Sequence, residues 1–398
     1  MHANQFGPSR HSMAKSLSSL WLKSVRRMGK AQQAQGRRLL QSLVPPPARK
    51  APARVAKARP AAPLRKSTPL PARALTSPPG SWQKSWFSVP AAGQLAPARR
   101  MLYWLYLPPD AGPGPLPLVV MLHGCQQLAT DFALSTRMNE LAARKGFAVL
   151  YPQQSAAADA HRCWHWYKRA TQEGLGDVRL IAEMITQVQA RHGLDSSRTY
   201  VAGLSAGAGL ANILALRYPA LVAAVGLHSA PVFGTTDSPM SAYGAMQHGS
   251  GQSHRESVRS FGSVEAAFPG MPAILIHGTR DSVVRRINMA QLTEQFTILN
   301  TGFITRGDAV VRHWPARSSG RHPRHAYESQ TWYAGRKPQL VACEIAQLGH
   351  AWSGGDGSVE FSAPEGPDAT LMMWTFFSRH RRLPAAATAP EVSEKSAV

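Results

Sequence analysis

The feature that most constrains this 398-residue chain is a strand-like segment, residues 200–202, that runs straight into Gly203-Leu204-Ser205-Ala206-Gly207. An apolar run with helical character follows the motif at residues 210–216. A strand that reverses into a helix within one residue forces the central serine into a strained backbone conformation, and side chains at the flanking positions would clash. Glycine has no Cβ and tolerates such a turn. The pattern therefore predicts a serine hydroxyl presented at the carboxyl end of a buried strand.

Strand patterns and helix patterns alternate along the rest of the chain. Strands are expected at residues 101–107, 116–122, 146–151, 221–227, 273–277, 309–313, 325–333 and 340–346. Helices are expected at about residues 131–145, 177–192, 286–299 and 368–380. This alternation predicts an α/β fold with a mostly parallel, doubly wound sheet and helices on both faces. Residues 229–270, rich in Gly, Ser and His, are predicted to form an irregular insertion that caps the site or remains a surface loop.

Positive charge is concentrated at the start of the chain. Residues 1–100 carry 19 Lys and Arg and no Asp or Glu, whereas the remainder carries 26 basic and 22 acidic side chains. A Pro- and Ala-rich run at residues 44–79 predicts an extended, solvated linker. Before it, apolar residues three and four apart predict a basic amphipathic helix near residues 12–43. We expect a largely disordered basic arm over residues 1–95, the α/β domain over 96–383 and a disordered tail over 384–398.

Targeting signals and cysteines bear on the compartment. No apolar run is long enough to span a membrane or to form the core of a signal peptide, since Lys23 interrupts the first candidate. Cys125, Cys163 and Cys343 are too few for a disulfide framework and lack zinc-ligand spacing, so the first expectation is that they are reduced and packed. The protein is therefore expected in the cytoplasm, where it could associate with a polymer granule. Secretion through an unrecognised signal is the alternative.

A nucleophilic serine needs a base and an acid. A serine hydroxyl is hardly ionised at pH 7, so a histidine must take its proton and a carboxylate must orient that histidine. Asp281 and His350 follow Ser205 in the order serine, acid, base, and both come just after predicted strands. The carboxyl ends of parallel strands meet at one edge of a sheet, where we expect these three side chains to gather. For Asp281, capping of the next helix is the competing interpretation. The alternative acids and bases are Asp177 and Glu344, and His123 and His277.

The same chemistry requires donors for the oxyanion. One donor should be the backbone N–H of Ala206, at the start of the helix that follows the sharp turn at Ser205; the turn and this helix are here called the elbow and the elbow helix. The second should come from the loop at residues 123–127, where Cys125 is the predicted donor, so its thiol is not the predicted nucleophile. Three tryptophans lie in loops near the predicted site, and we expect at least one to line the acyl or alcohol pocket, with ordinary loop packing as the alternative. They are Trp164, Trp166 and Trp352.

Six motifs, in order along residues 100–380, resemble those of the polyhydroxybutyrate (PHB) depolymerase family of esterases, which is related to feruloyl and acetylxylan esterases. They are His123-Gly124-Cys125-Gln126-Gln127, Tyr151-Pro152, Cys163-Trp164-His165-Trp166-Tyr167, Gly203-Leu204-Ser205-Ala206-Gly207, His277-Gly278 with Asp281, and Gly349-His350-Ala351-Trp352. The resemblance implies an α/β-hydrolase fold, a triad of Ser205, Asp281 and His350, no cofactor, and hydrolysis of short hydroxyalkanoate or related esters. It also suggests a disulfide between Cys125 and Cys163, which would favour an oxidising compartment. The basic arm lies outside the family pattern, and His165 stands where family members often have Asn.

The predicted function is therefore a serine carboxylesterase that acts on poly- or oligo-hydroxybutyrate. A feruloyl or acetyl esterase that acts on plant polysaccharide esters is the alternative enzyme. A different class of function is binding by the arm, with esterase activity secondary. Its 19 positive charges would bind nucleic acid through phosphates, but an apolar helix face favours an anionic surface or a polymer granule. A solvated tail without a partner is the third interpretation of the arm.

Overall fold

The computed structural model describes residues 78–89, 99–109, 112–234, 236–251, 253–264, 268–305, 307–319 and 323–382. The chain divides into two units, Met1–Pro78 and Pro79–Val398, and the second holds nearly all of these residues. The amphipathic helix expected near residues 12–43 and the tail expected over 384–398 lie outside the described residues.

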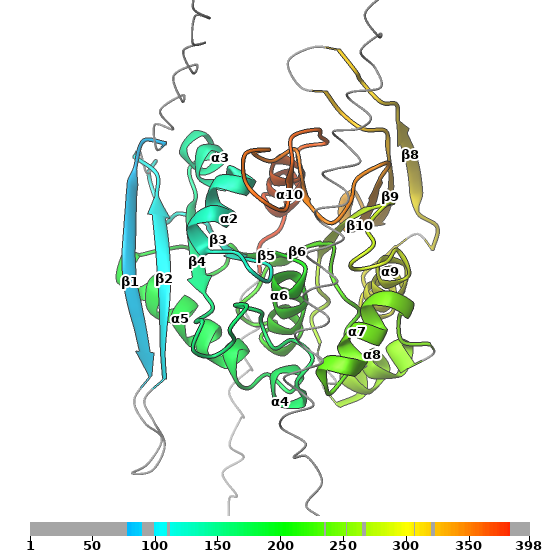
Figure 1. The fold of residues 1–398 in the computed structure, drawn as a ribbon, viewed down its shortest axis with the longest axis horizontal. Helices are drawn as coiled ribbons and strands as arrows, with labels where there is room; N and C mark the ends of the chain where they lie inside the picture. Colours follow the sequence, from blue (N-terminus) through cyan, green and yellow to red (C-terminus); the bar gives the residue numbers. More distant parts are fainter. Residues whose placement is uncertain are drawn as a thin grey trace, which may run out of the picture. The chain divides into compact units, whose positions relative to one another are not determined.

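The second unit is built on a ten-stranded sheet with the order β1-β2-β4-β3-β5-β6-β7-β10-β9-β8 (Figure 1). Its central strands run parallel: β4 (Ala148–Gln153), β3 (Leu118–Leu122), β5 (Thr199–Leu204), β6 (Ala224–His228), β7 (Ala273–Gly278) and β10 (Lys337–Ile345). Antiparallel strands close both edges: β1 (Ser81–Val89) and β2 (Arg99–Leu107) on one side, β9 (Tyr327–Ala334) and β8 (Val310–Trp314) on the other. The predicted mostly parallel α/β sheet is confirmed.

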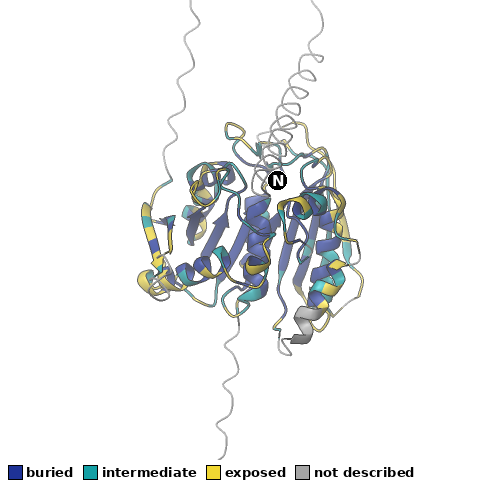
Figure 2. Ribbon diagram, turned by 60° about the horizontal axis from the view of Figure 1, so that its bottom comes forward, coloured by how far each residue is buried: buried dark blue, intermediate teal, exposed yellow. Residues whose placement is uncertain are grey.

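Helices cover both faces of the sheet. Ala202 and Leu204 of β5 belong to a buried cluster shared with α2 (Ala129–Thr136), α3 (Met138–Lys145) and α10 (Ala369–Phe377). The opposite face of β5 packs on α6 (Ala206–Arg217), which contacts α5 (Asp177–His192). Figure 2 shows the central strands buried between helices whose outer faces are exposed. The remaining short elements are α4 (Arg169–Gln172), β11 (Trp352–Ser353) and β12 (Ser362–Ala363).

The folded unit begins earlier than predicted. Residues 81–89, which we assigned to the arm, form strand β1. Phe87 on one face of β1 is buried, and Trp82 on the other face stacks on Trp104 of β2 with ring centroids 5.2 Å apart. An edge strand is half-exposed, and the apolar residues of β1, at positions 82, 86, 87 and 89, do not alternate regularly with polar ones such as Lys84, so the segment lacks the pattern of a buried strand. The boundary predicted after residue 95 is therefore corrected.

The helix expected over residues 131–145 is divided in two. Arg137 has a φ of 53°, a left-handed conformation that ends α2 and starts α3. Its guanidinium donates hydrogen bonds to the carbonyl oxygens of Gly354 and Gly355. The break therefore ties the start of the domain to the segment that follows His350.

The insertion at residues 229–270 is helical in part, which corrects the prediction of an irregular segment. It contains α7 (Pro239–His248) and α8 (Ser253–Val264). Ser238 and Ser241 cap α7 reciprocally, and Pro239 occupies its first turn, where the absent N–H costs nothing. The serines and the proline that suggested a loop are therefore helix-start signals.

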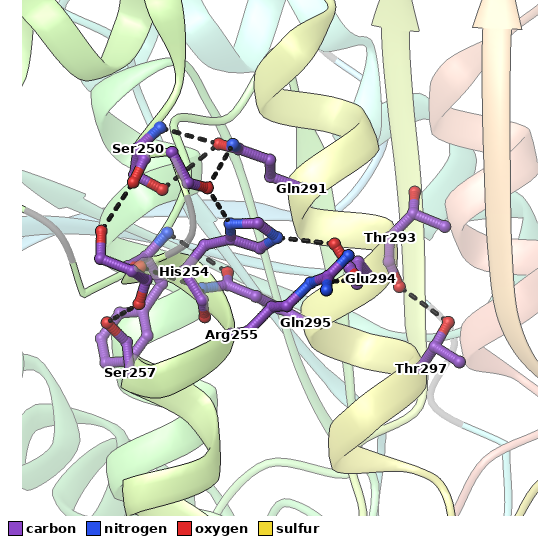
Figure 3. Close-up of polar contacts among 12 residues, drawn as sticks. Ser250, His254, Arg255, Ser257, Gln291, Thr293, Glu294, Gln295 and Thr297 are labelled. Atoms are coloured by element: carbon purple, nitrogen blue, oxygen red, sulfur yellow. Dashed lines mark hydrogen bonds and ion pairs between the residues drawn. The ribbon is translucent and has the colours of Figure 1, made fainter.

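Polar side chains fasten α8 to α9 (Ile287–Leu299), as Figure 3 shows. His254 Nε2 lies 2.7 Å from Glu294 Oε2, and Arg255 Nε lies 2.6 Å from Glu294 Oε1. Gln295 Nε2 donates to the carbonyl oxygens of His254 and Phe233, both at 2.9 Å. The insertion is thus a packed layer over α9 rather than a loose loop.

Within the described ranges, no helix combines the length and the apolar character needed to cross a membrane.

Candidate active site

Ser205 sits at the turn from β5 into α6, as the sequence predicts. Its φ of 57° and ψ of −121° are strained for a residue with a side chain. A Cβ added to Gly203 would lie 2.5 Å from the carbonyl carbon of Gly207, and one added to Gly207 would lie 2.1 Å from the carbonyl oxygen of Leu122. Both glycines are therefore required for the sharp turn that presents the Ser205 hydroxyl.

Asp281 and His350 meet at the carboxyl ends of β7 and β10. His350 Nδ1 lies 2.8 Å from Asp281 Oδ2, and the carboxylate is fully buried while the histidine side chain is 8% exposed. Asp281 Oδ1 accepts hydrogen bonds from the N–H groups of Val283 and Val284 at 3.0 and 2.9 Å. An ionised carboxylate only accepts, so Nδ1 of His350 carries the proton and Nε2 keeps its lone pair. In this arrangement Nε2 is the ring nitrogen of His350 that can accept a proton.

The charge state of Asp281 follows from its surroundings. Burial raises the pKa of this carboxyl, but the neighbouring His350 and His277 and the N–H of Val284 outweigh it and lower the pKa to about 2. Asp281 is therefore ionised throughout the neutral range and can stabilise an imidazolium at His350.

Ser205 lies at the same edge of the sheet as the Asp281–His350 pair. The Ser205 N–H donates to the carbonyl oxygen of His228 at the end of β6 (3.0 Å), and Ser229 N–H donates in turn to Ile276 of β7 (2.9 Å). In the sheet order β5-β6-β7-β10, the strand before Ser205 is followed by β6 and then by the two strands that precede Asp281 and His350. Among the described residues, the Ser205 hydroxyl makes no hydrogen bond with His350. In hydrolases of this kind the serine–histidine hydrogen bond is often long without substrate and shortens when substrate binds.

The loop at residues 123–127, here called the oxyanion loop, approaches the serine. A Cβ added to Gly124 would lie 3.6 Å from the Cβ of Ser205. Gly124 N–H donates to Gln127 Oε1 at 2.8 Å, which closes the loop. Neither Cys125 N–H nor Ala206 N–H donates a hydrogen bond within the described part of the chain. Both N–H groups therefore lack a partner among the described residues, and Gly124 brings the loop next to Ser205.

Cys125 and Cys163 form a disulfide across a separation of 38 residues. This pairing is the one that the family resemblance implied, and it corrects the expectation of three reduced cysteines. Cys343 is free and buried in β10. The oxyanion loop is thus covalently joined to the segment that contains Trp164 and Trp166.

The alternative acids have other partners. Asp177 accepts hydrogen bonds from Gln154 Nε2 at 2.8 Å and from Arg99 at 3.3 Å. Glu344 accepts two hydrogen bonds from the guanidinium of Arg286. Neither carboxylate contacts His350.

The alternative bases are fixed at strand ends, as expected. His123 is fully buried, with Nδ1 2.8 Å from the carbonyl oxygen of Gly124 and Nε2 accepting from the N–H of Gln154 at 3.1 Å. Burial lowers the pKa of His123 to about 4. His277 donates from Nε2 to the carbonyl oxygen of Val284 at 2.7 Å. Both ring nitrogens of His123 are therefore engaged, and among the described residues neither His123 nor His277 makes a hydrogen bond with the Ser205 side chain.

The three tryptophans differ in their surroundings. Trp164 and Trp352 have no exposed surface, and their indole N–H groups donate to the carbonyl oxygen of His123 (2.9 Å) and to Thr370 Oγ1 (3.1 Å). Trp166 is 5% exposed and borders a small recess beside Gly209 of α6. Ordinary packing accounts for Trp164 and Trp352, whereas Trp166 is the one of the three beside a recess near the elbow helix.

Within the described residues, no group of three or more His, Cys, Asp or Glu side chains is arranged to hold a metal ion.

Known proteins match this chain over its central part. The model of the family described as "Esterase PHB depolymerase" matches residues 101–317, which include Ser205 and Asp281. Poly(3-hydroxyalkanoate) depolymerase C from Paucimonas lemoignei is 32% identical over 196 residues, which are 48% of this chain and 46% of that protein. Probable acetylxylan esterase A from Neosartorya fischeri is 28% identical over 204 residues, which are 49% of this chain and 54% of that protein. The chain spans about half the length of these relatives.

A solved structure supports the fold. Acetyl xylan esterase from Aspergillus awamori superposes with a TM-score of 0.55 at 21% identity, covering 74% of this chain and 99% of that one. The strand order, the turn at Ser205 and this similarity define an α/β-hydrolase fold. With a family match over more than half of its length, the chain belongs to the PHB depolymerase family of esterases.

Proposed function

We propose that this protein is a serine carboxylesterase in which Ser205 is the nucleophile, His350 the base and Asp281 the orienting acid. The observation that carries the proposal is the 2.8 Å contact between His350 Nδ1 and the buried Asp281 carboxylate, at the carboxyl ends of the parallel strands, where Ser205 follows β5. Membership in an esterase family supports the same chemistry.

The reaction would pass through an acyl-enzyme. Ser205 Oγ attacks the ester carbonyl carbon while His350 Nε2 takes the hydroxyl proton, and the carbonyl oxygen becomes an oxyanion that accepts from the N–H groups of Ala206 and Cys125. His350 then gives its proton to the leaving alkoxide oxygen, and the ester bond breaks. Water then attacks the acyl carbonyl carbon while His350 Nε2 takes a proton from it. His350 passes this proton to Ser205 Oγ as the bond between Oγ and the acyl carbon breaks, which releases the carboxylic acid product and restores the Ser205 hydroxyl. Asp281 stays ionised throughout.

The proposed substrate is a short-chain hydroxyalkanoate ester, in the form of poly- or oligo-hydroxybutyrate. The name of the Paucimonas lemoignei relative supports this choice, and the names of the acetylxylan esterase relatives support acetylated plant polysaccharide as the second candidate. Release of 3-hydroxybutyrate from the polymer, measured against release of acetate from acetylated xylan, separates the two.

The proposed partner of the basic arm is a hydrophobic polymer granule or an anionic surface, argued from the arm's charge and its apolar periodicity. Pelleting with polymer granules, compared with retention on DNA, for proteins with and without residues 1–77, tests this assignment. The Cys125–Cys163 disulfide favours an oxidising compartment over the cytoplasm that composition suggested.

The test of the catalytic proposal is Ser205→Ala, assayed with p-nitrophenyl butyrate. We expect the turnover number to fall by at least about 10³-fold while the protein stays folded. Ser229→Ala is the matched control, since Ser229 also follows a parallel strand and has a φ of 50°. Wild-type turnover in Ser205→Ala would refute the proposal.

A further inference from the structure

Residues 159–164, here called the bracing loop, hold the oxyanion loop at three points. Gln126 N–H donates to the carbonyl oxygen of His161 at 2.7 Å. Cys163 is joined to Cys125 by the disulfide, and the Trp164 indole N–H donates to the carbonyl oxygen of His123 at 2.9 Å. The position of the Cys125 N–H therefore depends on the shape of the bracing loop.

A single carboxylate oxygen closes the bracing loop. Asp159 Oδ1 accepts hydrogen bonds from the N–H groups of His161 (2.9 Å) and Cys163 (3.0 Å). Arg162 lies between these two residues with a φ of 52°, and its N–H donates to the carbonyl oxygen of Asp159 at 2.8 Å. Asp159 thus fixes the two residues that hold Gln126 and Cys125.

The second oxygen of Asp159 faces His165. His165 Nε2 lies 3.4 Å from Asp159 Oδ2, and its Nδ1 lies 3.9 Å from Asp177 Oδ2. Burial raises the pKa of Asp159, but His165 and the two N–H groups outweigh it and lower the pKa below its usual value. An ionised acceptor forms stronger hydrogen bonds with the backbone than a neutral one does.

We propose that Asp159 is a positioning residue for the oxyanion hole, acting through His161 and Cys163 on the N–H of Cys125. The inference rests on the proposed function, because it needs Cys125 N–H to stabilise an oxyanion. Such a donor is effective only when it lies about 2.7–3.1 Å from the oxyanion. A small shift of the oxyanion loop therefore destabilises the transition state more than it destabilises the bound ester. Loss of Asp159 should therefore lower kcat and leave KM nearly unchanged.

Three variants of Asp159 test this role with a soluble ester. Asp159→Ala removes both acceptor bonds and should lower kcat about 10- to 100-fold, with KM within about threefold. Asp159→Asn keeps a side-chain oxygen that can accept both N–H groups and should restore kcat to within about fivefold of wild type. Asp159→Ser, whose shorter side chain reaches fewer donors, should be intermediate.

The matched control is Asp195→Ala. Asp195 Oδ1 accepts the N–H of Ser197 at 2.9 Å and closes a similar turn, but at the opposite edge of the sheet, just before β5. It also pairs with Arg198 and Arg381, so its loss should lower the melting temperature. We expect Asp195→Ala to keep the wild-type kcat.

A pair of ketone inhibitors separates oxyanion stabilisation from general damage to the site. Ser205 Oγ adds to the carbonyl carbon of an alkyl trifluoromethyl ketone, its proton passes to His350, and the carbonyl electron pair becomes an oxyanion. The matching methyl ketone binds largely without this addition. In Asp159→Ala, affinity for the trifluoromethyl ketone should fall by about the same factor as kcat/KM, with affinity for the methyl ketone unchanged.

The kcat and the two ketone affinities of the Asp159 variants decide whether Asp159 positions the oxyanion hole. Wild-type kcat in folded Asp159→Ala, or equal losses of affinity for both ketones, would overturn the positioning role. If Asp159→Ala does not fold, the same two criteria apply to Asp159→Ser. Failure of the proposed function is recognised separately, since Ser205→Ala would then hydrolyse the ester as well as wild type does.

Discussion

His350 Nδ1 and Asp281 Oδ2 are 2.8 Å apart although 69 residues separate them in the chain. The two residues follow β7 and β10, which pair in parallel register from Leu340 opposite Ala273 to Ile345 opposite Gly278. Beyond that register, Arg280 N–H donates to the carbonyl oxygen of Leu348 at 3.0 Å. The pairing of β7 with β10 therefore brings the backbones of Asp281 and His350 close together.

Asp281→Asn should abolish most of the activity without changing the shape of the site. The amide would favour the wrong tautomer of His350 and could not stabilise the imidazolium, so we expect kcat to fall about 10³- to 10⁴-fold with little change in KM. Steady-state hydrolysis of p-nitrophenyl butyrate measures this. Glu344→Gln is the control, because Glu344 pairs with Arg286 and should be dispensable for turnover. Near-normal turnover in Asp281→Asn would exclude Asp281 as the acid.

Gly207→Ala should damage folding as well as catalysis. The new Cβ would lie 2.1 Å from the carbonyl oxygen of Leu122 and 2.4 Å from that of His123, both rigid backbone atoms. We expect a loss of about 3 kcal/mol or more in the free energy of unfolding, measured by chemical denaturation. Gly244→Ala on α7 meets nothing within 4 Å and should be neutral or stabilise by up to about 1 kcal/mol. Equal stabilities for the two variants would contradict this account of the elbow.

Reduction of the disulfide should lower stability and activity together. Breaking the Cys125–Cys163 bond, either with a phosphine reductant or as Cys163→Ser, should cost about 2–4 kcal/mol of unfolding free energy. It should also lower kcat, because the oxyanion loop loses one of its three attachments. Cys343→Ala is the control, since its cysteine is free and the variant should respond to reductant as wild type does. A reduced enzyme with unchanged melting temperature would argue against the bond.

Acid should destabilise the protein below pH 6.5 through buried histidines. Burial lowers the pKa of His123 to about 4 and that of His228 to about 3. The unfolded state therefore binds more protons, so stability is complete above the unfolded pKa of about 6.5 and is lost as the pH falls below it. Protonation of each histidine should lower the free energy of unfolding by about 2 kcal/mol between pH 7 and pH 5.

Denaturation curves at the two pH values check this, with His228→Asn showing a smaller pH difference than wild type. His313, whose side chain is 74% exposed, provides the control variant His313→Asn, which should keep the full difference. A wild-type protein equally stable at pH 7 and pH 5 would contradict the prediction.

Local patterns predicted the parts of this molecule that depend on short stretches of chain. The turn at Ser205 is encoded by two glycines and the strand before them, and the helices at residues 177–192 and 286–299 by periodicity. Asp281 and His350 were chosen because they follow strands in the right order, and they do meet. The assignment of their catalytic roles stays a prediction.

Features set by long-range packing were not predicted. Trp164 and Trp352 look like loop residues in the sequence but are fully buried, because segments distant in the chain cover them. The link from Gln126 to His161 uses backbone atoms, so no residue type announces it. Asp159 is not predicted either, although its contacts are local, because its partners are backbone N–H groups, which no residue type marks in the sequence.

The left-handed break at Arg137 limits how far this domain can be recombined with its relatives. The guanidinium of Arg137, ten residues beyond the oxyanion loop, donates hydrogen bonds to Gly354 and Gly355, which lie past the end of the family match at residue 317. A chimaera that takes the front of the domain from one parent and its last quarter from another would separate these partners. The segments that contain Arg137 and Gly354 should therefore come from the same parent, although more than two hundred residues lie between them.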